Sequence, residues 1–192
     1  MIKKVNVVVG SFFTQFIIVG MLFTYGVLMT ELEKEFGWSR TILSSIGAAG
    51  WLSWGLLAIP GGYLNDRLGP RIVLSVNGFI FGIGVILFSL SNEVWHLFLI
   101  FFFFIGVGLS THDISTLSTI AKWFDTKRGL MTSVAKIGTA MGQMIMPPLI
   151  AFLIISFGWR TAAFYLGIAA SIGLVLAASI ITAPKTSAKT PT

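Results

Sequence analysis

The chain alternates long apolar runs with short polar links. A membrane-spanning helix needs about 20 mostly apolar residues to cross roughly 30 Å of hydrocarbon. Six runs meet that length, and the spans they predict cover residues 7–29, 41–63, 72–90, 95–120, 130–157 and 161–183. Because the links are short, successive helices should run antiparallel. The pattern therefore predicts an all-α membrane protein, with one six-helix transmembrane bundle over residues 1–183 and a polar tail over residues 184–192.

The composition supports this class and excludes several others. Of the chain, 55% is hydrophobic and only 10% is charged, whereas soluble domains carry about 25% charged residues. With no cysteine present, disulfides, zinc-thiolate sites and cysteine nucleophiles are ruled out. The sequence shows no metal-ligand spacing, phosphate-binding loop or nucleophile arrangement, so we expect no enzyme, no cofactor and no metal site.

Basic residues concentrate on one side of the predicted bundle. If the N-terminus is cytoplasmic, nine basic residues face the cytoplasm: Lys3, Lys4, Arg67, Arg71, Lys122, Lys127, Arg128, Lys185 and Lys189. Only Lys34, Arg40 and Arg160 then lie outside. By the positive-inside rule, both termini of this multi-pass protein of the cell membrane are expected in the cytoplasm. The same bias explains the formal net charge of +6 without a nucleic-acid partner.

The link between the second and third predicted spans is the most informative segment. It reads Gly62-Tyr63-Leu64-Asn65-Asp66-Arg67-Leu68-Gly69-Pro70-Arg71, or G-x-L-x-D-R-x-G-x-R. This pattern resembles the signature loop between helices two and three of the major facilitator superfamily of secondary transporters. Residues 25–40 and residues 121–160 are similar to the monocarboxylate-porter and oxalate/formate-antiporter branch of that superfamily.

The resemblance implies a fold and a location for the site. Members of the family have twelve spans in two six-helix halves, each a three-plus-three bundle, and bind substrate between the halves near the midplane. This chain would supply one half, and its tail would begin the central loop between halves. We therefore expect a fragment or truncation of a longer protein, or a half-transporter that pairs with a second copy.

The same resemblance assigns a conformational role to the link. It implies that Asp66 stabilises the outward-facing state by pairing near helix ends of the opposite half. Arg67 and Arg71 would fix the loop and contact anionic lipid headgroups, and Gly62 and Gly69 would allow a tight reversal. The alternative is a plain cytoplasmic turn that obeys the positive-inside rule.

Two stretches depart from the branch pattern. Animal monocarboxylate porters have an acidic residue, a glycine and an aromatic residue at the start of span one, where this chain has Val9-Gly10-Ser11-Phe12-Phe13. Many proton-coupled members have an arginine early in span four, where this chain has residues 101–104, all phenylalanine. Lactate-type specificity and that coupling residue are therefore not expected.

Polar and charged residues inside the predicted spans are the candidates for a substrate cavity. Charges inside a bilayer cost roughly 2.5–3.5 kcal/mol or more, so they face the bundle interior or a water-filled cavity. Asp113 and Lys136 lie at similar depths on antiparallel neighbours, so an ion pair between them is geometrically possible. The full set of candidates is Gln15, Tyr25, His112, Asp113, Lys136 and Gln143.

These candidates have structural alternatives of equal standing. In the functional reading, Lys136 would bind a carboxylate and His112 would tune or shuttle a proton. The alternative is a structural charge pair between spans four and five. For Gln15, Tyr25 and Gln143 the alternative is hydrogen bonding between helices. Gly78-x-x-x-Gly82 and Gly138-x-x-x-Gly142 predict close approach of helices.

The sequence thus favours a secondary active transporter that works by alternating access. Its expected cargo is a small organic anion, a carboxylate by the branch resemblance and by Lys136, in symport or antiport with H+ or a counter-anion. Further expected partners are membrane lipid and a second six-helix half, in cis or as a second copy. The competing functions are a non-transporting membrane sensor or assembly partner built on a half-transporter fold, and a homodimeric half-transporter.

Overall fold

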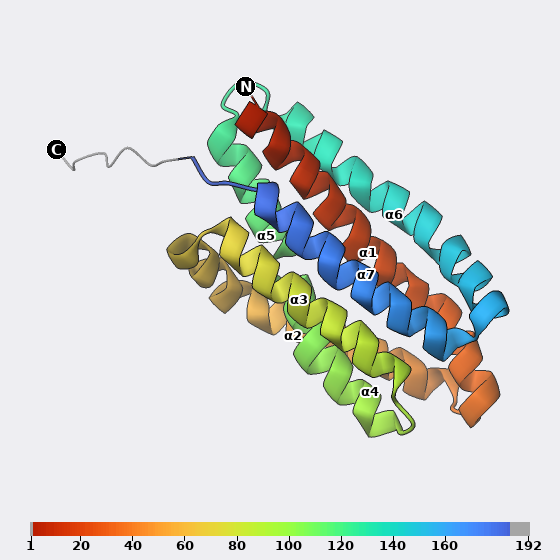
Figure 1. Cartoon of the computed structure of the whole chain (residues 1–192). Helices are drawn as coiled ribbons and strands as arrows, with labels where there is room; N and C mark the ends of the chain where they lie inside the picture. Colours follow the sequence, from red (N-terminus) through yellow and green to blue (C-terminus); the bar gives the residue numbers. More distant parts are fainter. Residues whose placement is uncertain (1, 185–192) are drawn as a thin grey trace.

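The computed structural model describes residues 2–184, and every regular element in that range is helical. The elements are α1 (Ile2–Phe36), α2 (Arg40–Leu68), α3 (Pro70–Ser89), α4 (Val94–Ile100), a π-helical turn η1 (Phe101–Ile105), α5 (Gly106–Trp123), α6 (Arg128–Phe157) and α7 (Trp159–Ile180). Because α4, η1 and α5 run on as one helix, the described chain contains six helices long and apolar enough to cross a membrane (Figure 1). The expected number and order of spans are confirmed. Of the predicted tail, residues 185–192 lie outside the described range.

The helices extend beyond their apolar centres. Helix α1 has 35 residues, which corresponds to about 52 Å at 1.5 Å per residue, well above the thickness of the hydrocarbon. The ends of such helices lie among headgroups and water, where polar residues are tolerated. Apolar runs therefore located the spans, but they placed most of the helix ends inside the true bounds.

The largest correction concerns the link between α2 and α3. A loop over residues 62–71 was expected, but α2 continues to Leu68 and α3 begins at Pro70, so Gly69 alone joins them. Gly69 has a φ of 84°, a backbone region that residues with a Cβ rarely enter. The reversal therefore depends on Gly69, whereas Gly62 is simply a helical residue of α2. Gly158, with a φ of 78°, joins α6 to α7 in the same way.

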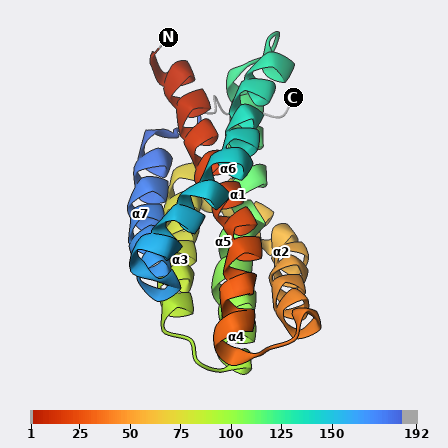
Figure 2. The same ribbon diagram turned by 90° about the vertical axis from the view of Figure 1, so that its right-hand side faces the viewer.

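The spans pack as two related sets of three. Helix α1, the first span, lies along α6, the fifth span. Helix α2, the second span, lies along α5, which belongs to the fourth span. Helices α3 and α7, the third and sixth spans, lie along each other, as Figures 1 and 2 show from two sides. This exchange of partners is what a three-plus-three bundle with an internal repeat requires.

Small residues allow these helices to approach closely, as their spacing predicted. A Cβ added to Gly138 on α6 would collide with the carbonyl oxygen of Phe12 on α1, and one on Gly142 would collide with that of Phe16. A Cβ on Gly82 of α3 would collide in the same way with Ser171 of α7. Contacts at backbone distance replace the hydrophobic driving force that helices lack within lipid.

Two helices carry the open side of the bundle. Only 11% of the residues in an apolar 18-residue stretch of α6 and 22% of those in such a stretch of α2 are buried, against 44% to 56% for the other four spans. The exposed residues are mostly large and apolar, such as Leu56 and Ile59 on α2 and Met144 and Ile155 on α6. This side is therefore apolar enough to meet lipid or another apolar protein surface.

Arg160 joins the helix ends opposite the start of α1. Its guanidinium donates to the carbonyl oxygens of Ser89 and Ser91 at 3.0 and 3.1 Å, and to Glu35 Oε1 at 3.0 Å. Trp159 donates its indole N–H to the same carboxylate at 2.5 Å. The end of α1, the link after α3 and the start of α7 are thereby held together.

Candidate functional site

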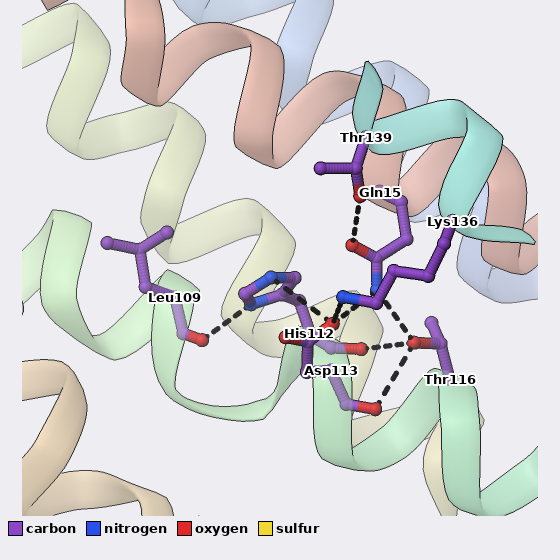
Figure 3. Close-up of polar contacts among 7 residues, drawn as sticks. All are labelled: Gln15, Leu109, His112, Asp113, Thr116, Lys136 and Thr139. Carbon is purple, nitrogen blue, oxygen red and sulfur yellow. Dashed lines mark hydrogen bonds and ion pairs between the residues drawn. The ribbon is translucent and has the colours of Figure 1, made fainter. Parts of the chain in front are cut away.

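Three spans bring charged and amide side chains together inside the bundle. Asp113 on α5 accepts hydrogen bonds at its Oδ1 from Lys136 Nζ of α6 at 2.5 Å and from Gln15 Nε2 of α1 at 2.6 Å (Figure 3). The predicted ion pair between spans four and five is therefore formed. Gln15, Asp113 and Lys136, with the two threonines described next, are called the polar cluster below.

Gln15 connects the cluster to two hydroxyl groups. Its Nε2 also lies 3.2 Å from Thr116 Oγ1, and its Oε1 accepts a hydrogen bond from Thr139 Oγ1 at 3.0 Å. Thr116 and Thr139 were not among the predicted residues. Their spacing is a usable signal, because each follows a charged candidate, Asp113 or Lys136, by three residues and so shares its helix face.

The cluster is covered on one side and open on the other. Gln15 is fully buried, whereas the side chains of Asp113 and Lys136 are 32% and 39% exposed. The two opposite charges cancel, which lowers the cost of holding either one at membrane depth. Their remaining exposure leaves both charged groups within reach of a ligand that enters from the open side.

A groove leads to this exposed edge between α5 and α6. Its volume is about 810 Å³. Asp113 lies at the end of the groove nearest the cluster, and Arg128 lies at the start of α6, about 12 Å from Lys136 along the helix axis at 1.5 Å per residue. The other lining residues are Ile114, Leu117, Ser118, Gly129, Thr132 and Ser133.

His112 neighbours the ion pair but does not face the groove. Its ring is 3% exposed and lies against Trp54 of α2, with ring centroids 5.8 Å apart. Its Nδ1 lies 2.6 Å from the carbonyl oxygen of Leu109, so Nδ1 carries a hydrogen, because a carbonyl can only accept. Its Nε2 is 3.7 Å from Asp113 Oδ1, which is too far for a hydrogen bond.

The other two predicted cavity residues lie away from the polar cluster. Tyr25 donates its hydroxyl to the carbonyl oxygen of Leu43 at 2.7 Å and packs its ring against Phe88 and Phe101. It lines a separate apolar cavity of about 40 Å³ in the core. Gln143 lies about two turns beyond Lys136 on α6, half-buried. A shared helix face with Gln15 or Lys136 therefore did not bring these side chains into the polar cluster.

The residues predicted for the conformational link are spread over the end of α2 and the start of α3. Asp66 lies 3.4 Å from Lys122 at the end of α5, with side chains 72% and 51% exposed. The Arg67 guanidinium lies over the ring of Tyr63, 4.4 Å from its centroid. Asp66 therefore has a contact within this bundle, and its expected pairing with helix ends of an opposite half stays a prediction. Arg71 is exposed at the start of α3.

Comparison with known proteins agrees with this architecture. Residues 11–192 match the family model described as Major Facilitator Superfamily. The agnestins efflux protein of Paecilomyces divaricatus is 31% identical over 84% of this chain and 39% of its own length. Monocarboxylate transporter 13 of Rattus norvegicus is 27% identical over 81% of this chain and 36% of its own length. Human monocarboxylate transporter 7 is 26% identical over 84% of this chain and 31% of its own length.

The chain spans 31% to 39% of the length of these relatives. The family match covers most of the chain and coincides with the six described spans. The pairing of span one with five and of span two with four is the arrangement expected of one half of such a protein. This chain belongs to the major facilitator superfamily and is a multi-pass membrane protein with the helices of one six-span half.

Proposed function

We propose that the chain forms the first half of a secondary transporter that moves a small organic anion, a carboxylate, by alternating access. The observation that carries the proposal is a partly exposed Lys136 ammonium within the bundle, held 2.5 Å from the Asp113 carboxylate at the edge of a groove. The names of several relatives, the monocarboxylate transporters, support the same class of cargo.

The polar cluster holds Lys136 ready while no cargo is bound. Asp113 neutralises the ammonium, and Gln15 donates to the same oxygen, Oδ1, so the carboxylate is fixed in one orientation. A cargo carboxylate that arrives through the groove competes with Asp113 for Lys136, since both are anions that accept from the same donor. Gln15 and Thr139 then keep the binding edge in place through their mutual hydrogen bond.

A second six-helix half completes the cavity in this proposal. The open side of the bundle, formed by α2 and α6, carries large apolar side chains beside the partly exposed ion pair. Covering this side would enclose the groove and exclude lipid from the charges. The second half comes either from the same polypeptide or from a second copy, and the remaining apolar surface faces membrane lipid.

The end of α2 acts as the conformational control point. The one-residue reversal into α3 is flanked by the residues assigned to the conformational link: Gly62, Asp66, Arg67, Gly69 and Arg71. In this proposal the reversal faces the cytoplasm, as do the N- and C-terminal sides of the bundle. The contact between Asp66 and Lys122 joins α2 to α5, the helix that carries Asp113. A change of partner for Asp66 during the transport cycle would therefore be felt at the cargo site.

The test is uptake of a labelled short-chain monocarboxylate into proteoliposomes that contain the protein as the cell makes it. Lys136→Ala is expected to abolish uptake while membrane insertion is unchanged, because no other residue of the polar cluster supplies a positive charge. The matched control is Lys34→Ala, which removes an exposed lysine paired with Glu31 at the far end of α1. Normal uptake by Lys136→Ala would remove this lysine from the site.

A further inference from the structure

The fourth span contains a π-helical turn ahead of the polar cluster. It runs from Phe101 to Ile105, between α4 and α5, and the N–H of Gly106 donates to the carbonyl oxygen of Phe101 five residues earlier. A π-turn accommodates one residue more than an α-turn, and such turns are rare and frequently found at functional sites. This turn begins twelve residues before Asp113 in the same continuous helix.

Ser53 of α2 supports the turn directly. Its hydroxyl donates to the carbonyl oxygen of Phe102 at 2.6 Å, and Ser53 is fully buried. A π-turn interrupts the regular i→i+4 ladder, so a carbonyl within it benefits from an outside donor. A buried carbonyl without a partner would be costly. The serine therefore supplies an outside donor to a carbonyl within the π-turn.

The backbone of α2 also lies directly against this turn. A Cβ on Gly106 would collide with the side chain of Ser53 and would lie 3.0 Å from the carbonyl oxygen of Gly50. A Cβ on Gly50 would lie 3.3 Å from the ring of Phe101. The two helices therefore meet at backbone distance at Gly50, Ser53 and Gly106, so Ser53 lies in direct contact with the turn.

The turn determines which way α5 faces. An α-helix advances by about 100° per residue, so a π-turn that became an α-turn without losing a residue would rotate α5 by about 100° relative to α4. We propose that the π-turn, stabilised by Ser53, sets the rotation of α5 that aims Asp113 at Lys136 and Gln15. Ser53 is then a positioning residue for the proposed anion site, and its effect on transport rests on the proposed function.

A geometric measurement tests the proposal without any transport assay. The chain has no cysteine, so Gln15→Cys/Thr116→Cys provides a clean thiol pair between α1 and α5, whose native side chains lie 3.2 Å apart. Adding Ser53→Ala should lower the yield of a short thiol cross-linker about tenfold, the equilibrium shift expected from one lost buried hydrogen bond.

A second thiol pair serves as the matched control. Gln15→Cys/Thr139→Cys joins α1 to α6, whose native side chains lie 3.0 Å apart and do not involve the fourth span. Ser53→Ala should leave the cross-linking of this pair unchanged. An unchanged yield for the α1–α5 pair would overturn the proposal, and so would an equal loss in both pairs, because it would indicate general loosening of the bundle.

A deletion distinguishes rotation from simple loss of packing. Deleting Phe103, which is 56% exposed, removes the extra residue and allows a plain α-helix with Asp113 facing its original direction. The double change, deletion of Phe103 with Ser53→Ala, should therefore restore both α1–α5 cross-linking and uptake to within about twofold of the unaltered protein. A double variant as impaired as Ser53→Ala alone would overturn the proposal.

Other results separate this proposal from the proposed function. If Ser53→Ala does not reach the membrane, the variant with Phe103 deleted tests the proposal by itself. Its α1–α5 thiol pair should still cross-link, and a loss of this cross-linking would overturn the proposal. If cross-linking changes as expected while the unaltered protein takes up no carboxylate, the positioning role holds and the proposed cargo is wrong.

Discussion

At the residue scale, the ion pair between Asp113 and Lys136 makes both charges tolerable inside the bundle. Each charge alone at membrane depth would cost several kcal/mol. At 2.5 Å they neutralise each other, and Gln15 adds a hydrogen bond to the same carboxylate oxygen. The pair is partly exposed, so water screens the attraction between the two charges, and each charge also loses less hydration than it would in a fully buried pair.

The pair predicts an asymmetric response to mutation. Asp113→Asn leaves the Lys136 ammonium without its counter-ion and should lower the free energy of unfolding by about 1–3 kcal/mol. Adding Lys136→Met removes the orphaned charge and should recover most of that loss, in a double-mutant cycle measured by thermal unfolding in mild detergent. If Asp113→Asn alone matches the unaltered protein in stability, the pair is not structurally important.

At the element scale, the bundle depends on close contact between the backbones of paired helices. Gly138 and Gly142 place α6 directly against the carbonyl groups of α1, and the hydrogen bond from Thr139 to Gln15 crosses the same helix pair. A carbonyl oxygen cannot move aside as a flexible side chain can. The separation of α1 and α6, and with it the geometry of the polar cluster, is therefore controlled by residues that bear no functional group.

Gly138→Ala should push these helices apart. The added Cβ would overlap the carbonyl oxygen of Phe12, so we expect a loss of about 1–3 kcal/mol in the free energy of unfolding, the usual range for overpacking. Gly26→Ala in α1 is the control, because a Cβ added there would meet nothing within 4 Å. This change should be neutral or slightly stabilising, since alanine is the better helix former. Equal effects of the two changes would contradict the packing argument.

At the scale of the whole molecule, the end of α2, which faces the cytoplasm in our proposal, contacts the helix that carries the proposed cargo site. Asp66 contacts Lys122 at the last turn of α5, and Asp113 lies on the same helix. Both side chains are largely exposed, so this contact contributes little to stability. A weak and accessible contact is suited to exchange partners during a conformational cycle, whereas a strong buried one would resist it.

Asp66→Asn should therefore slow turnover more than binding. We expect the maximal uptake rate to fall about tenfold or more while the half-saturating cargo concentration changes less than about twofold, because the substitution alters the conformational step and leaves Lys136 intact. Uptake at varied cargo concentration measures both quantities. Glu33→Gln is a suitable control, because Glu33 is an exposed acidic residue near the C-terminal end of α1 that pairs with Arg40, away from the link between α2 and α3. Turnover equal to that of the unaltered protein would remove Asp66 from the gating role.

Much of the fold could be predicted because its signals are local. Apolar runs of sufficient length located all six spans, and small residues spaced by four located the positions of close approach on α6 and α3, although the partner helices α1 and α7 came from the structure. Candidate charges were equally visible, since Asp113 and Lys136 stand out in apolar surroundings. Helix ends were less accurate, because the helix continues into the interface where hydropathy no longer distinguishes helix from loop.

By itself, the sequence determined the class of protein and the six spans, indicated the family through the link over residues 62–71, and showed that an ion pair between spans four and five was geometrically possible. The class, the spans and the candidate charges follow from the cost of placing polar groups in hydrocarbon, which every residue meets regardless of its neighbours, whereas the family follows from a local motif. Only the tertiary structure decided which side chains share the site. Thr116 and Thr139 lie with Gln15, Tyr25 packs against the apolar core and not in the polar cluster, and Gly69 alone joins α2 to α3. Those outcomes depend on how each helix is rotated and how closely it packs, which hydropathy does not report.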